Sequence, residues 1–113
     1  REEARMARFM IIGTYAPEGA RGLMAAGGSA RKTAVEKAVS GLGGRLETFD
    51  FAFGGEDVFA IVDMPDSESA AALALTVGGT GAVDVRTVVL ITPEQLDRAA
   101  QLRPEYAAPG QTG

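Results

Sequence analysis

The residues that could do chemistry are few, because the 113-residue chain contains neither histidine nor cysteine. Without thiolate and imidazole groups there is no disulfide and none of the usual zinc ligands, axial haem ligands or nucleophile–base pairs. The sequence therefore predicts neither a bound cofactor nor a metal site. An enzymatic function would be of the cofactor-free type, with Tyr15, Lys32 or Asp50 moving a proton.

Three phenylalanines occupy every second position in the segment Phe49-Asp-Phe-Ala-Phe-Gly-Gly-Glu-Asp57. On a strand all three would point to one side and Asp50 to the other. Two interpretations remain open. The phenylalanines either fill a core or a dimer seam, or Phe49 and Phe51 line an apolar pocket in which Tyr15 is the polar group.

Asp50 is flanked by apolar residues, where an unpaired carboxylate is costly, so it needs a partner or solvent. Arg86 lies among valines of a later apolar segment and is the predicted partner. The two side chains would either form a salt bridge across a dimer or orient an anionic or carbonyl ligand.

The segment Gly27-Gly-Ser-Ala-Arg-Lys32 precedes a helical pattern. It is either a flexible turn with Ser29 as the helix N-cap, or an anion site formed by free backbone N–H groups and the nearby cations Arg31 and Lys32. The spacing is not that of a P-loop.

Apolar periodicity and turn residues place these side chains on a predicted series of elements. Residues 16–28 are predicted to be a loop with one or two helical turns, and Thr92-Pro-Glu-Gln95 has the form of a capping box. Strands are predicted at 8–15, 45–53, 57–63 and 82–91, and helices at 29–42, 66–78 and 93–102. The order strand, helix, strand, strand, helix, strand predicts an α+β, ferredoxin-like domain over residues 6–103, followed by a flexible tail at 104–113.

Both sides of the predicted strands are apolar, with Phe9 and Ile11 on one side of the first strand and Met10 and Ile12 on the other. The helices cover only one face of a ferredoxin-like sheet, so something else must cover the second. A second copy of the same sheet does so with a single self-complementary surface. The sequence therefore predicts a homodimer with sheets packed face to face, a dimeric α/β barrel.

Charge and hydropathy exclude further classes of protein. A net charge of −4 without a run of lysine or arginine argues against a nucleic-acid partner. The longest apolar runs, such as 9–12 and 88–91, are far shorter than the roughly 20 residues that span a bilayer. The first residues include charged side chains and show no secretory pattern, so we expect a soluble, cytoplasmic protein.

The segments 12–22, 27–32 and 52–66 together resemble the GYD domain family of small bacterial and archaeal proteins, which is grouped with the dimeric α/β-barrel superfamily. The resemblance implies the fold and the paired sheets. It implies little chemistry, because the family has no settled activity. Its glycine-tyrosine-aspartate signature corresponds here to Gly54, Glu56 and Asp57, so no role for the signature tyrosine carries over.

The sequence thus predicts a small homo-oligomeric protein that binds a compact apolar or aromatic ligand at or beside the dimer barrel. One alternative is a structural module that assembles into a larger complex with itself or another protein. The other is an enzyme that resembles the cofactor-free monooxygenases and cyclases of the same superfamily.

Overall fold

A computed structural model describes residues 6–110 of the chain. The first five residues, which bear on the expectation of no secretory signal, and the last three of the predicted tail lie outside that range. The elements are β1 (Ala7–Tyr15), α1 (Pro17–Ala26), α2 (Gly28–Gly41), β2 (Arg45–Phe51), β3 (Val58–Met64), α3 (Ser67–Gly78), β4 (Val83–Leu90) and α4 (Pro93–Ala100).

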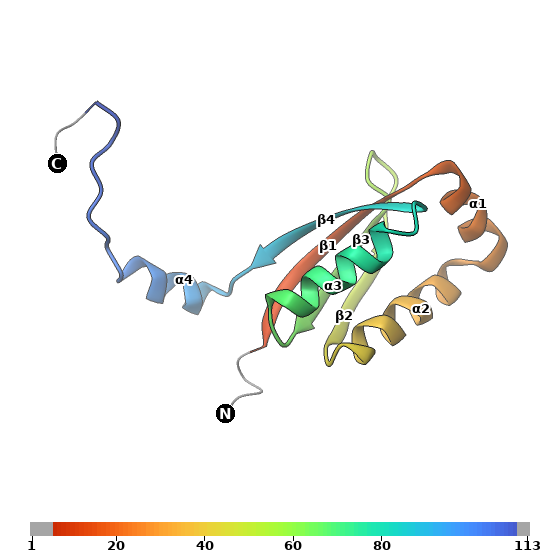
Figure 1. The fold of residues 1–113 in the computed structure, drawn as a ribbon, viewed down its shortest axis with the longest axis horizontal. Helices are drawn as coiled ribbons and strands as arrows, with labels where there is room; N and C mark the ends of the chain where they lie inside the picture. The colour runs from red at the N-terminus through yellow and green to blue at the C-terminus, as the bar shows by residue number, and fades with distance from the viewer. Residues whose placement is uncertain (1–5, 111–113) are drawn as a thin grey trace.

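The four strands form one sheet in the order β2-β3-β1-β4, and every neighbouring pair is antiparallel. Helices α1, α2 and α3 lie on one side of this sheet (Figure 1). This is the ferredoxin-like arrangement, and it confirms the predicted fold. None of the helices in residues 6–110 is long and apolar enough to cross a membrane.

Strand alternation divides the sheet into a helix face and an open face. On the helix face, Phe9 pairs in register with Val62, and both pack with Val39 of α2 and Leu73 of α3 in the buried core. We call the other side of the sheet the open face. Its apolar residues are Met10, Ile12, Phe59, Ile61, Val88 and Leu90.

The segment between β1 and α2 differs from the prediction. It contains a ten-residue helix, α1, rather than a loop with one or two turns. Pro17 at the first helical position has its φ already set for a helix. The proposed N-cap at Ser29 is wrong, since α2 begins at Gly28 after Gly27, whose φ of 91° makes the turn between the helices.

Strand β2 is shorter than predicted and ends at Phe51. The backbone N–H of Ala52 donates to the carbonyl oxygen of Asp57 at 2.9 Å and closes the loop before β3. Phe53 therefore lies outside the strand with 99% of its surface exposed, and the prediction that all three phenylalanines share one side fails for it.

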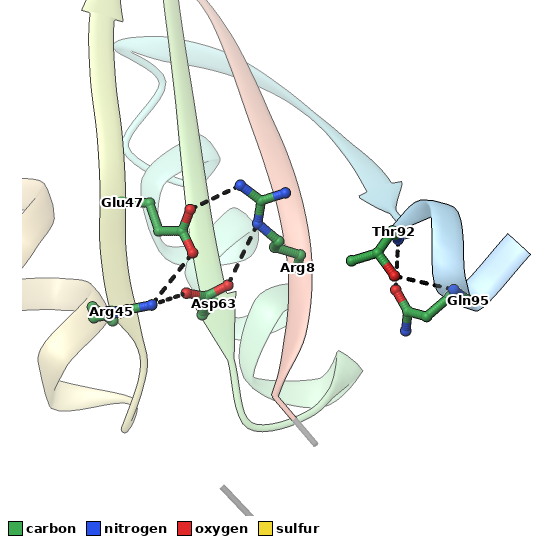
Figure 2. Close-up of polar contacts among 6 residues, drawn as sticks. All are labelled: Arg8, Arg45, Glu47, Asp63, Thr92 and Gln95. Carbon is green, nitrogen blue, oxygen red and sulfur yellow. Dashed lines mark hydrogen bonds and ion pairs between the residues drawn. The ribbon is translucent and has the colours of Figure 1, made fainter. Parts of the chain in front are cut away.

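The predicted capping box is confirmed at the start of α4. The N–H of Gln95 donates to the Thr92 hydroxyl at 3.1 Å, and the N–H of Thr92 donates to the Gln95 side-chain oxygen at 2.7 Å (Figure 2). No residue of α4 is buried, and the helix projects from the end of β4 (Figure 1). The radius of gyration is 17.5 Å, above the roughly 13 Å of a compact chain of this length.

Candidate functional site

A cavity of about 460 Å³ lies on the helix face, between the sheet and the three helices. Its walls are mostly aliphatic and aromatic. Ile11, Phe49 and Val85 contribute from the strands, Leu23 and Val35 from α1 and α2, and Val77 from α3. A volume of several hundred Å³ with apolar walls is typical of small-molecule sites.

Small side chains explain why this part of the helix face is hollow. Strand β1 has Phe9 in the filled core but Gly13 at the cavity, and β3 has Met64 in the core but Ala60 at the cavity. Above the cavity, α1 approaches the start of β4 so closely that a Cβ at Gly19 would collide with the backbone of Ala82. Only glycine permits this approach, which places α1 as the outer wall.

Phe49 and Phe51 lie together on the helix face, as the strand alternation predicts. Their rings meet edge to face, with centroids 5.3 Å apart. Phe49 lines the cavity, whereas Phe51 lies against Gly28 at the start of α2 and is 37% exposed. Neither ring is on the open face, so neither belongs to a seam between two open faces.

The polar residues of the cavity wall are Tyr15, Glu18, Arg31, Thr76 and Thr80. Burial is the main effect on Tyr15 and raises the pKa of its phenol, while the positive charge of Arg31 acts in the opposite direction. The carboxylate of Asp57 adds to the increase. The hydroxyl of Tyr15 is thus a half-buried neutral donor in the same cavity wall as the Arg31 cation.

Asp57 holds the end of β1 next to the cavity. Its side chain accepts a 2.8 Å hydrogen bond from the N–H of Tyr15, and its own N–H donates to the carbonyl oxygen of Gly13 at 2.9 Å. With the bond from Ala52, the aspartate connects β1 to the β2–β3 loop. Asp57 therefore positions Tyr15.

The other predicted site residues lie elsewhere. Asp50 is exposed on the open face of β2, and Arg86 lies on β4, at the opposite edge of the sheet, so one chain does not bring them together. Arg86 instead donates to Glu56 at 2.7 Å in an exposed ion pair. Lys32 is exposed on α2 and is not part of the cavity wall, and Gly54 lies in the exposed loop before β3.

A group of four charged residues lies at one end of the open face (Figure 2). Arg8 donates to Glu47 and Arg45 donates to Asp63, each at 2.8 Å. The Arg8 hydrogen bond lowers the pKa of Glu47 to about 2, with a further contribution from Asp63. Asp63 is buried, and burial together with Glu47 raises its pKa against the opposing effect of Arg45. Among residues 6–110 no group of acidic side chains is arranged to hold a metal ion.

Sequence reasoning missed Glu18 and Arg31 as cavity residues and Asp57 as the residue that positions Tyr15. Arg31 and Lys32 are the two cations of the segment that was considered for anion binding, and of the two only Arg31 lines the cavity. Glu18 was missed because α1 was not predicted.

The fold and cavity define a ferredoxin-like α+β domain with a ligand-sized hollow on the helix side of its sheet. The chain belongs to the GYD domain family, since the sequence model of that domain matches residues 9–100. No curated protein and no solved structure gives a significant match to the chain.

Proposed function

We propose that the protein is a cytoplasmic homodimer that binds one compact apolar or aromatic molecule per chain in the helix-face cavity. The observation that carries this proposal is the 460 Å³ hollow with its largely apolar wall. The ligand site would lie beside the barrel formed by the two sheets, not inside it.

The physical reason is the cost of leaving such a hollow unfilled. Protein interiors pack as densely as organic crystals, and the atoms around an empty apolar cavity lose their dispersion contacts on one side. Covering an apolar wall that otherwise faces water is favourable for an apolar guest. A ligand that covers Ile11, Phe49 and Val85 would restore those contacts.

Binding of N-phenyl-1-naphthylamine, an uncharged probe that fluoresces in apolar surroundings, tests the proposal. Both Ala30 and Ala34 are exposed on α2, but only Ala30 lines the cavity. We expect Ala30→Phe to fill part of the hollow and weaken probe binding about tenfold or more, since roughly 1.4 kcal/mol of lost contact is tenfold in affinity. Ala34→Phe is the matched control.

Saturable binding to the wild type that is lost in Ala30→Phe and kept in Ala34→Phe would support the cavity as the site. Equal binding by both variants would place the probe elsewhere and overturn the proposal. Circular dichroism on both variants shows whether each is folded.

The open face supports the homodimer part of the proposal. Ile12 is buried within the sheet surface, and Met10, Phe59, Ile61, Val88 and Leu90 are half-buried with no helix of residues 6–110 packed on them. A contiguous apolar surface of this kind marks an interaction site. We infer that a second copy covers it, because one self-complementary surface is sufficient for a two-fold dimer.

The assembly test compares two lysine substitutions on opposite faces of the sheet. Ile61→Lys puts a charge on the open face of the central strand β3, and Thr87→Lys puts one on the exposed helix face of β4. We expect light scattering to give a dimer mass for the wild type and Thr87→Lys, and a monomer mass for Ile61→Lys. A dimer that survives Ile61→Lys would exclude the open face as its interface.

The alternative function, a structural module that assembles with itself or another protein, is supported by the segment that projects from the domain and begins with α4. Leu96, Leu102 and Tyr106 are exposed there at 58%, 77% and 80%. An isolated helix of eight residues is marginal in water, so α4 needs a surface to pack on. Because α4 follows directly from the open-face residues Val88 and Leu90, we propose that this surface is also on the second copy. Loss of the dimer mass in Leu96→Ser, with Arg98→Ser as control, is the expected result, and an unchanged mass would contradict it.

A further inference from the structure

We propose that the ligand of the helix-face cavity carries an acidic group, such as a carboxylate, sulfonate or acidic enol, placed against Arg31 and Tyr15. This inference rests on the proposed function, since it specifies the class of molecule that the cavity accepts. Its apolar body would lie against Phe49 and the valines, and its acidic end would lie at the cation.

Arg31 is an exposed cation that forms part of a mostly apolar wall. It lines the cavity, yet it makes no ion pair or side-chain hydrogen bond within residues 6–110, whereas Arg8, Arg45 and Arg86 on the strands are all paired with carboxylates. A guanidinium presents several N–H donors in a fixed plane and has no acceptor. Its best complement is therefore an anion with two oxygens, which it binds with two parallel hydrogen bonds.

Tyr15 supplies a second donor on the same wall. Tyr15 and Arg31 both line the cavity, and the positive charge of Arg31 acts on the phenol. The Asp57 bond to the N–H of Tyr15 fixes the backbone from which the phenol projects. A neutral phenol beside a guanidinium is a pair of donors, and only a group rich in acceptors satisfies both.

Glu18 is the cavity residue that would favour a positively charged ligand instead of an acidic one. It also lines the cavity, in the exposed first turn of α1. The charged groups that act on Tyr15 are Arg31 and Asp57, and Glu18 is not among them. We therefore assign the acidic group of the ligand to Arg31, and Glu18→Gln is included in the test to check this assignment.

Two fluorescent probes that differ in one group test the inference. N-phenyl-1-naphthylamine is uncharged, and 8-anilinonaphthalene-1-sulfonate has the same rings with an added sulfonate. Dissociation constants for both are measured with the wild type, Arg31→Gln and Lys32→Gln. Lys32→Gln is the matched control, because it removes an equal charge from the next residue of α2, outside the cavity wall.

We expect the wild type to bind the sulfonate probe more tightly than the uncharged one. Arg31→Gln should weaken sulfonate binding about tenfold, the effect of one charge-assisted hydrogen bond, and change uncharged-probe binding less than about twofold. Lys32→Gln should leave both constants within about twofold, because Lys32 does not line the cavity and its exposed charge is screened by salt.

Several outcomes overturn the inference. Equal losses of sulfonate-probe affinity in Arg31→Gln and Lys32→Gln would show a general effect of net charge. An unchanged sulfonate-probe affinity in Arg31→Gln would show that the arginine does not contact the acidic group. A gain in sulfonate affinity above the wild type in Glu18→Gln, without a loss in Arg31→Gln, would place the acid at α1. If the uncharged probe binds as well as the sulfonate probe, the cavity proposal stands and only the acidic group is wrong. If neither probe binds, the proposed function itself fails.

Discussion

The two ends of the helix face are built on the same sheet, but one end is filled with side chains and the other contains a hollow. At one end Phe9, Val62 and Met64 fill the space beneath α2 and α3, and Val62 and Met64 have no exposed surface. At the other end Gly13 and Ala60 leave a hollow of about 460 Å³ beneath α1. The two ends differ in the size of their side chains and in the cover provided by α1, which lines the hollow only.

This difference shows how one sheet separates stability from recognition. Burial of large apolar side chains stabilises the domain, and the cost of a deletion depends on how much surrounding structure packs on the deleted group. A residue at the edge of a hollow has fewer such contacts to lose. The filled end should therefore set the free energy of unfolding, and the hollow end should set what the protein binds.

The largest expected effect compares two phenylalanines on the helix face. Phe9 is 4% exposed in the filled core, and Phe49 is half-buried at the cavity. We expect Phe9→Ala to lower the free energy of unfolding by about 4 kcal/mol and Phe49→Ala by less than about 2 kcal/mol, because the second deletion enlarges an existing hollow. Urea denaturation of both variants measures the difference.

The same two variants should also differ in their affinity for the uncharged probe. Phe49→Ala should weaken uncharged-probe binding, whereas Phe9→Ala, where it folds, should keep it. Similar losses of stability in the two variants would mean that the cavity is closed in solution, and the contrast between the two ends would disappear.

A smaller effect is expected from the two adjacent acids of the signature segment. Asp57→Ala leaves the N–H of Tyr15 without its acceptor, at a cost of about 1 to 2 kcal/mol. Glu56→Ala removes only the exposed ion pair with Arg86, which is worth about 0.5 kcal/mol or less. Thermal denaturation compares the two stabilities, and titration with the sulfonate probe shows whether Tyr15 has moved.

The conservative variant makes this comparison specific. Asp57→Asn keeps a side-chain oxygen that can accept from the N–H of Tyr15, so it should recover most of the stability and probe affinity lost in Asp57→Ala. If Glu56→Ala costs as much as Asp57→Ala, the aspartate does not position the cavity residues as we infer.

The sequence was sufficient for the fold because each element has its own local signal. The alternation around Phe9 and Ile11 specifies β1, and the Thr92 capping box specifies the start of α4. Helix α1 was missed because its ten residues include two glycines and Pro17, which together resemble a loop. The proline is in fact at the one helical position that suits it, and Gly19 is required by the contact with Ala82.

The candidate site was harder to predict than the fold, because it depends on residues brought together from distant elements. Tyr15 and Phe49 were identified from their types, and they do share a cavity. The pairing of Asp50 with Arg86 was proposed from composition alone, and the strand order puts the two on opposite edges of one sheet. Whether they meet across a dimer stays a prediction. Arg31 could not be chosen over Lys32 without knowing which side of α2 faces the sheet.

The smallest effect that we expect is the pH dependence of stability contributed by the charged end of the open face, which has no counterpart in the apolar core of the helix face. Glu47 accepts from Arg8 there, and that bond holds its pKa at about 2, below the ordinary 4.5. A carboxyl with a lowered folded-state pKa adds stability above its unfolded pKa, and this contribution is lost as the pH falls from 4.5 toward 2. The raised pKa of Asp63 acts in the opposite direction, since it penalises the folded state as the pH rises above 3.8, so the net change is small.

The measurement is the difference in thermal midpoint between the wild type and Glu47→Gln as a function of pH. The substitution keeps a side-chain oxygen that can accept from Arg8 but removes the negative charge that strengthens this bond, so the wild type should be the more stable at neutral pH. The difference should shrink steadily below pH 4.5, as Glu47 becomes protonated in the unfolded chain first. Glu36→Gln is the control, because Glu36 is exposed on α2 and makes no ion pair within residues 6–110. A difference that stays constant with pH would show that the Arg8–Glu47 bond adds no charge-dependent stability. The open face would then contribute to this chain only through its apolar residues.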